Sequence, residues 1–87
     1  MTKCVAVFRS KTELFTFINY LKYQGALVET VATPKEARIG CGISAKFDER
    51  FFRLAIEIIE NYTFSRFFGI YKIKHDGVRR TSILVYT

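Results

Sequence analysis

A cysteine between two glycines is the feature of this chain that points most directly to chemistry. Cys41 lies between Gly40 and Gly42, where the backbone can turn tightly and another molecule can come close. Two basic residues, Lys35 and Arg38, precede it in the same segment. Positive charge beside an accessible thiol favours the thiolate, the reactive form of cysteine. Cys41 is therefore the candidate reactive residue, with Gly42, Lys35 and Arg38 as its supporting residues. The alternative is a partly buried cysteine that only packs against its neighbours.

The other residues capable of chemistry form no recognisable site in the sequence. Cys4 is far from Cys41, and the absence of a CxxC pair or a Cys/His cluster argues against structural zinc and thioredoxin-type redox chemistry. The single histidine, His75, lies beside the turn signal Asp76-Gly77, so we expect it to be a solvated turn residue and not the base of a hydrolytic triad. No glycine fingerprint of a phosphate loop surrounds Cys41. We expect no metal and no cofactor.

The length and charge of the chain limit the classes of protein to which it can belong. Its 87 residues predict one domain over 1–87. The net charge of +6 favours anionic partners, although a basic surface can also serve solubility alone. No apolar run approaches the roughly 20 residues of a membrane-spanning helix, and no signal peptide is visible. These features predict a cytoplasmic protein with free thiols and no membrane contact.

The elements that must position Cys41 follow from hydrophobic patterning. Ser10 and Glu13 form a capping-box pattern at the start of a first helix, and Gly25 is placed to end it. Asp48 is placed to cap a second helix. Apolar residues at helical spacing predict the buried faces of the two helices: Leu14, Phe15, Ile18 and Leu21 in the first, and Phe51, Phe52, Ala55, Ile58, Ile59 and Tyr62 in the second. Short apolar or alternating runs predict strands over 4–8, 27–32, 43–47, 67–74 and 81–86.

The order of these elements, β-α-β-β-α-β with a further strand, is that of the ferredoxin-like split βαβ arrangement. Right-handed crossovers then give an α+β sandwich with an antiparallel sheet of order 4-1-3-2, both helices on one face, and the last strand beside strand four. The core is expected over 3–74, with a hairpin extension over 75–87. This topology places Cys41 at the end of the sheet where the first helix starts, near Arg9 and Lys11. Cys4 belongs to the opposite end, too far away for a disulfide.

Two other surfaces could bind a partner. The C-terminal hairpin could neutralise phosphates and stack on bases in a nucleic acid, through basic and aromatic residues at Tyr71, Lys72, Lys74, His75, Arg79, Arg80 and Tyr86. A charged edge that discourages strand addition explains the same residues without a ligand, and is the reading we favour. The second surface is the helix-free face of the sheet, which a second subunit could cover. That face would carry part of an aromatic set that could equally be core: Phe51, Phe52, Phe64, Phe67 and Phe68.

Residues 5–73 contain four features in a set order: the strand Val5-Ala6-Val7-Phe8, then Thr33-Pro34-Lys35, then the pair Cys41-Gly42 seven residues after Pro34, and then Ala45 and Phe47. In these features the segment resembles a small bacterial family of selenium/sulfur (Se/S) carrier-like proteins. The chain has Lys35 and Gly40 where the family usually has arginine and serine.

The resemblance implies a ferredoxin-like carrier that holds sulfur or selenium on Cys41 as a persulfide or selenosulfide, with Pro34 and Gly42 shaping the loop. Its partners would be a cysteine desulfurase or another donor, and an acceptor protein. Such a chain is a carrier with at most sulfurtransferase character and not an ordinary enzyme. The alternative function is a non-enzymatic binding module that uses the basic hairpin or the open sheet face.

Overall fold

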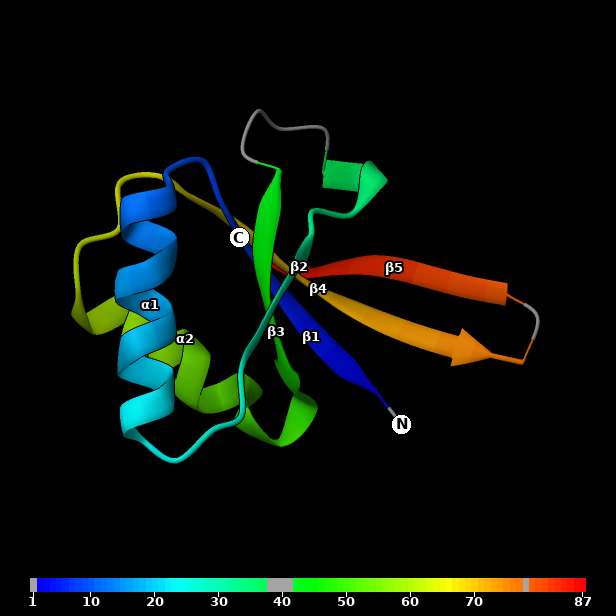
Figure 1. Ribbon diagram of the computed structural model, residues 1–87, viewed down its shortest axis with the longest axis horizontal. Helices are drawn as coiled ribbons and strands as arrows, with labels where there is room; N and C mark the ends of the chain where they lie inside the picture. Colours follow the sequence, from blue (N-terminus) through cyan, green and yellow to red (C-terminus); the bar gives the residue numbers. More distant parts are fainter. Residues whose placement is uncertain (1, 38–41, 78) are drawn as a thin grey trace.

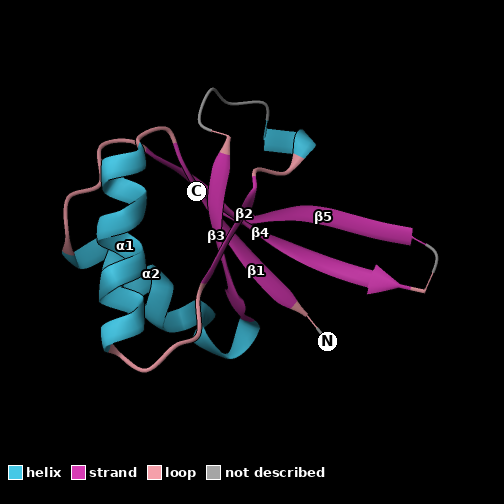
Figure 2. Cartoon of the chain, viewed as in Figure 1, coloured by secondary structure: helices cyan, strands magenta, loops and turns pink. Residues whose placement is uncertain are grey.

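The computed structural model of the protein describes residues 2–37, 42–77 and 79–87, with only the backbone described at 75, 76, 79 and 80. Within these residues the protein has five strands and two α-helices (Figures 1 and 2). Strands β1 (Lys3–Phe8), β2 (Glu29–Ala32), β3 (Ile43–Asp48), β4 (Phe67–Asp76) and β5 (Arg79–Tyr86) alternate with helices α1 (Lys11–Tyr23) and α2 (Phe52–Asn61). Two short 3-10 helices, η1 (Lys35–Ala37) and η2 (Glu49–Phe51), precede β3 and α2.

The sheet confirms the expected topology. Its order is β2-β3-β1-β4-β5, and every neighbouring pair is antiparallel. Read from β4 this is the predicted 4-1-3-2, with the last strand beside strand four. Strand β1 pairs with both β3 and β4, and its residues 4–8 are all buried because apolar clusters cover both of its faces. The fold is therefore α+β, of the ferredoxin-like split βαβ kind.

Helix α1 buries a different face from the one expected. Leu14, Phe17, Ile18 and Leu21 are its buried residues, whereas the Phe15 side chain is 45% exposed. Positions 14, 17, 18 and 21 lie on one face at 3.6 residues per turn, and residue 15 is turned about 100° away from residue 14. The prediction of Phe15 in the core was wrong, and Phe17 was missed.

The first turn of α1 has one of the two hydrogen bonds expected of a capping box. The Ser10 side chain accepts the Glu13 N–H at 3.3 Å, as in a capping box. The Glu13 carboxylate does not return to Ser10. It accepts the Arg66 N–H at 2.7 Å and the Ser65 hydroxyl at 3.0 Å, so it joins the start of α1 to the segment that leads into β4. At the other end of α1, Gly25 has a φ of +96°, which a glycine adopts without strain.

Three further boundaries differ from the prediction. Strand β2 begins at Glu29, and the Leu27 side chain before it is 88% exposed. Asp48 accepts the Arg50 N–H at 3.0 Å and so caps η2, while α2 begins at Phe52. Strand β4 runs to Asp76 and β5 starts at Arg79, so the hairpin is longer than predicted and projects away from the helices (Figure 1).

The two faces of the sheet carry separate apolar clusters. The helix-covered face holds the larger one, in which the Phe8 ring lies 5.3 to 5.5 Å from three other phenylalanine rings. The other face carries a smaller buried cluster of Val5, Val7, Ala37, Tyr71 and Ile73. Ala37 belongs to η1, so this short segment crosses and partly covers the face that the helices leave open.

Candidate functional site

The candidate reactive residue lies in the connection between β2 and β3. Cys41 and Arg38 are outside the described residues, so the structure positions the site through the residues around them. The last pair of the β2–β3 ladder is Ala32 with Ile43. Beyond it, the Thr33 N–H donates to the Gly42 carbonyl at 3.0 Å. Gly42, the neighbour of Cys41, is thus held at the start of β3.

A side-chain hydrogen bond reinforces the base of this connection. The hydroxyls of Thr33 and Ser44 lie 2.8 Å apart, and Ser44 is the buried polar residue of the described core. A buried hydroxyl that lost its partner would cost about 1–3 kcal/mol, so the pair favours one arrangement of the two strand ends. Gly42 is exposed, and a Cβ added to it would meet no atom within 4 Å. The Cα of Gly42 therefore faces open space.

Segment η1 lies on the helix-free face of the sheet, and this determines where the basic residues lie. The Pro34 carbonyl accepts the Ala37 N–H at 3.1 Å, and Ala37 is buried against the smaller apolar cluster. Lys35, in the same turn, is exposed. The Arg9 guanidinium lies 5.1 Å from the centre of the Phe68 ring, which packs against that same cluster.

The expected group of basic residues is therefore divided between the two faces of the sheet. Lys35 and the Arg9 guanidinium lie on the helix-free side. Lys11 lies in the first turn of α1, on the helix-covered side. The start of β3 does lie at the same end of the sheet as the start of α1, since Ala6, near the exit of β1, pairs with Ala45.

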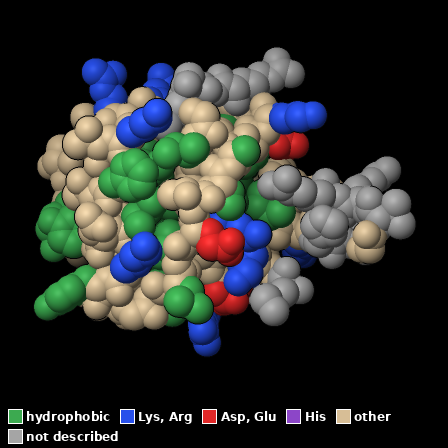
Figure 3. All heavy atoms as spheres, viewed as in Figure 1, with side chains coloured by type: hydrophobic (Ala, Val, Ile, Leu, Met, Phe, Trp, Pro, Cys, Tyr) green, Lys and Arg blue, Asp and Glu red, His purple; other side chains and the backbone are tan. Residues whose placement is uncertain are grey.

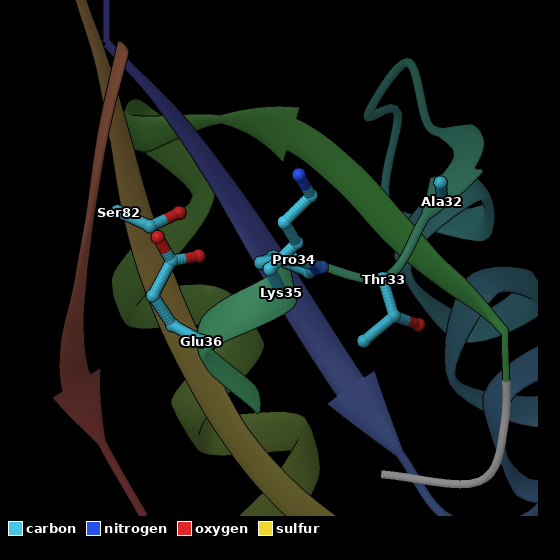
Figure 4. A pocket seen from close by; sticks show the side chains of 6 residues that line it. All are labelled: Ala32, Thr33, Pro34, Lys35, Glu36 and Ser82. Atoms are coloured by element: carbon cyan, nitrogen blue, oxygen red, sulfur yellow. The ribbon is translucent and has the colours of Figure 1, made fainter. Parts of the chain in front are cut away.

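A pocket of about 390 Å³ lies between η1 and β5 (Figure 4). Its walls are Ala32, Thr33, Pro34, Lys35, Glu36 and Ser82. The Glu36 carboxylate and the Ser82 side chain point toward one another across it (Figure 4). Glu36 also contributes, after burial, to raising the pKa of the Tyr71 phenol beneath η1. This pocket could not be predicted from the sequence, because it forms only when the pairing of β5 with β4 brings Ser82 close to η1.

Cys4 has surroundings unsuited to reactivity. It is a free cysteine with no exposed surface, and it pairs across the sheet with Phe47 and Lys72, at the end away from Gly42. Burial raises the pKa of its thiol from about 9 to about 11, and Glu49 and Asp48 add to the rise while Lys72 opposes it. At neutral pH this thiol stays protonated and out of contact with solvent.

The raised pKa of Cys4 predicts a specific loss of stability at alkaline pH. The folded protein holds this proton more tightly than the unfolded chain, so the stabilisation is complete below about pH 9 and is lost as the pH rises through about 11. Two pKa units correspond to a fall of about 2–3 kcal/mol in the free energy of unfolding. Urea titrations from pH 8 to pH 11 should show a shallower fall for Cys4→Ala than for the parent. An equal fall in the free energy of unfolding for the two proteins would contradict this prediction.

Among the described side chains of the basic hairpin, Lys72, Tyr71 and Tyr86 do not form one surface for a nucleic acid. The Lys72 ammonium lies 3.7 Å from the Glu49 carboxylate and 5.7 Å from the centre of the Phe52 ring. Tyr71 is buried on the helix-free face, and the Tyr86 hydroxyl donates to Glu60 at 3.0 Å on the other side. The two tyrosines therefore form no common stacking surface. Figure 3 shows the described Lys and Arg side chains at several separate places on the visible face.

Other classes of site are also absent from the part of the chain that the structure describes. No three His, Cys, Asp or Glu side chains among the described residues are grouped so that they could hold a metal ion. Within the same residues, neither helix has the length and apolar character needed to cross a membrane.

Comparison with known protein families gives a match over most of the chain. The family model described as "Putative Se/S carrier protein-like" matches residues 3–72, which include all four strands of the βαββαβ unit up to Lys72, both helices and the β2–β3 connection with Cys41. No curated protein and no solved structure matches the chain. The chain belongs to this Se/S carrier protein-like family.

Proposed function

We propose that this protein carries a sulfur or selenium atom on Cys41 and passes it to a partner protein. The observation that supports this assignment most directly is the state of the other cysteine. A carrier of this kind needs a thiolate that a donor protein can reach. Cys4 is fully buried and its pKa is about 11, which leaves Cys41 to do the chemistry that the family description names.

The transfer needs no cofactor on this chain. The Cys41 thiolate attacks the outer sulfur of a persulfide on the donor protein, such as a cysteine desulfurase. A new sulfur–sulfur bond forms on Cys41, the sulfur–sulfur bond of the donor breaks, and the donor cysteine leaves as a thiolate with the bonding electrons. An acceptor thiolate repeats the exchange at the Cys41 persulfide. A selenium atom bound to the donor cysteine would move by the same displacement.

The residues around Cys41 suit such an exchange between two proteins. Gly42 is exposed with free space at its Cα, and the bonds from Thr33 hold it at the start of β3. A donor cysteine must come within bonding distance of Cys41, and the missing side chains at Gly40 and Gly42 lower the steric cost of that approach. Lys35 and Arg38 add positive charge that favours the thiolate.

A loading reaction tests the proposal. The protein is incubated with a cysteine desulfurase and free cysteine, the small thiols are removed, and the intact mass is measured. We expect a gain of one sulfur atom that disappears on treatment with a phosphine or a thiol reductant. A protein that keeps its original mass under conditions that load a known acceptor would contradict the proposal.

The role of Lys35 and Arg38 has its own readout. Alkylation of Cys41 by iodoacetamide follows the fraction of thiolate, so its rate against pH gives the pKa of the thiol. Neutralising both charges, in Lys35→Gln with Arg38→Gln, should move the midpoint of this profile to higher pH. The control is the double variant Lys22→Gln with Lys46→Gln, which has the same net charge as the first double variant but keeps Lys35 and Arg38. It should have the same midpoint as the parent. An equal midpoint in the two double variants would show that Lys35 and Arg38 do not favour the thiolate of Cys41.

A further inference from the structure

We propose that two copies of this chain associate through the outer edge of β5, which joins their sheets into one continuous antiparallel sheet. The surface is distinct from the helix-free face discussed above. It does not include Cys41, so it stands or falls separately from the carrier function.

Strand β5 is an edge of the sheet with an unusual composition. It is the last strand in the order β2-β3-β1-β4-β5, and among the described residues no strand pairs with its outer side. Its consecutive residues Ile83, Leu84 and Val85 are 56%, 44% and 37% exposed. An exposed, apolar edge strand presents unpaired N–H and C=O groups and is a template for pairing with another strand.

The opposite edge of the sheet shows how an unused edge is usually protected. Strand β2 has four residues, and its first two, Glu29 and Thr30, are polar and exposed. Short length and charge both discourage strand addition. Strand β5 has eight residues, and its charged residues are confined to one end, at Arg79 and Arg80. The charged-edge interpretation of this hairpin therefore applies to its tip and not to Ile83, Leu84 and Val85.

A second copy is the partner whose chemistry matches this edge. An antiparallel arrangement about a two-fold axis near Ile83 sets the apolar residues of one copy against those of the other. The end that carries Arg79 and Arg80 then comes beside Tyr86 of the other copy. The Tyr86 hydroxyl donates to the Glu60 carboxylate at 3.0 Å, so the end of β5 opposite the arginines has an acidic residue beside it. A parallel arrangement would place the arginines of the two copies side by side.

The register of the hairpin favours an association through the edge of β5 over one through a face of the sheet, because the exposed apolar residues of β5 do not share one face. Ile83 pairs with Lys72, whose ammonium lies near Glu49 and the Phe52 ring on the helix-covered side. Leu84 pairs with Tyr71, which is buried on the helix-free side. Adjacent residues of β5 therefore point to opposite faces. An association through the helix-free face would involve Leu84 and leave Ile83 in solvent, whereas the edge association uses both.

A bulge limits the length of the regular edge. The register of β5 against β4 shifts so that Ile70 pairs with Tyr86 and Tyr71 with Leu84, which leaves Val85 without an opposite residue. The contact is therefore short, and smaller than the roughly 1,600 Å² of a standard interface. We expect a reversible dimer that dissociates at micromolar concentration and not a permanent one.

Sedimentation velocity tests the dimer in reducing buffer, which removes any disulfide through Cys41. The parent protein should change from monomer to dimer over about 1–300 µM, which spans dissociation constants in the micromolar range. Ile83→Lys and Leu84→Lys should each raise the dissociation constant about tenfold or more, because the two-fold axis sets the new charges close together. Leu27→Lys, at an apolar residue that is 88% exposed far from β5 in the sequence, is the matched control and should dimerise like the parent.

Three outcomes would overturn the proposal. The first is a parent protein that remains monomeric throughout the range. The second is a dimer that Ile83→Lys leaves intact, which would point to the helix-free face. The third comes from amide hydrogen exchange of the unmodified protein, which does not depend on any variant folding. Protection of the β5 amides should rise with protein concentration, and constant protection would contradict the edge contact.

Discussion

A Cys41→Ser protein is expected to gain no sulfur in the desulfurase reaction, whereas Cys4→Ala should gain one atom as the parent does. The serine hydroxyl is almost the same size but cannot form a persulfide, so the loss isolates the thiol itself. The Cys4 thiol is buried and has a pKa of about 11, so it cannot replace Cys41 at neutral pH. Intact mass spectrometry of the three proteins, loaded side by side, gives the comparison.

The contrast between the two variants decides the site. Equal loading of Cys41→Ser and the parent would exclude Cys41, and loading lost in Cys4→Ala but kept in Cys41→Ser would assign the chemistry to the core cysteine. Both variants should first be compared by thermal unfolding, since Cys4→Ala removes a buried sulfur and lowers stability. Loading is therefore measured well below the melting temperature of the less stable protein.

A Phe8→Ala protein is expected to lose about 3–5 kcal/mol of its free energy of unfolding, which is the range for deleting a buried phenylalanine side chain. The Phe8 ring has no exposed surface and lies within 5.5 Å of the rings of Phe17, Phe64 and Phe67. It comes from the central strand and lies close to rings from α1, from the segment before β4 and from the first residue of β4. Its removal leaves a cavity where these elements meet, in a domain with a total stability of about 4–13 kcal/mol.

Phe15→Ala is the matched control for this loss. It makes the same chemical change on a side chain that is 45% exposed, so we expect a cost of about 1 kcal/mol or less. Urea denaturation at one pH measures the free energy of unfolding of both variants. It is followed by far-UV circular dichroism, since the chain has no tryptophan for a fluorescence measurement. Similar costs for the two variants would mean that the ring cluster around Phe8 is not the centre of the core.

The two phenylalanines also show what the sequence could and could not predict. The capping residues, the glycine turns and the alternation of helix and strand patterns were sufficient to predict the topology. A split βαβ order leaves few arrangements in which both crossovers are right-handed. They were not sufficient for the side-chain detail of α1. A helix with Leu14, Phe15, Phe17 and Ile18 has apolar residues on more than one face, and packing against β1 decides which ring is buried.

The candidate site was less predictable than the fold. Cys41 could be selected from its glycines and nearby charges, but no periodic pattern marks residues 33–37. Their path across the helix-free face depends on the burial of Ala37 against strands that are distant in sequence. That path moves Lys35 away from α1, which a prediction from chain order alone could not foresee. The same limit applies to Glu13, whose carboxylate binds residues 65 and 66 instead of its own helix.

The central position of β1 has a consequence for synthesis of the protein. This strand is made before both of its neighbours, β3 and β4, and its residues from Cys4 to Phe8 are among the most apolar of the chain. At about 5–20 residues per second, the ribosome needs several seconds to complete Phe67–Asp76 after β1. Strand β3 is made first and can pair with one edge of β1, but the other edge of this apolar strand has no partner until β4 is complete, so β1 is the segment of the nascent chain most exposed to aggregation.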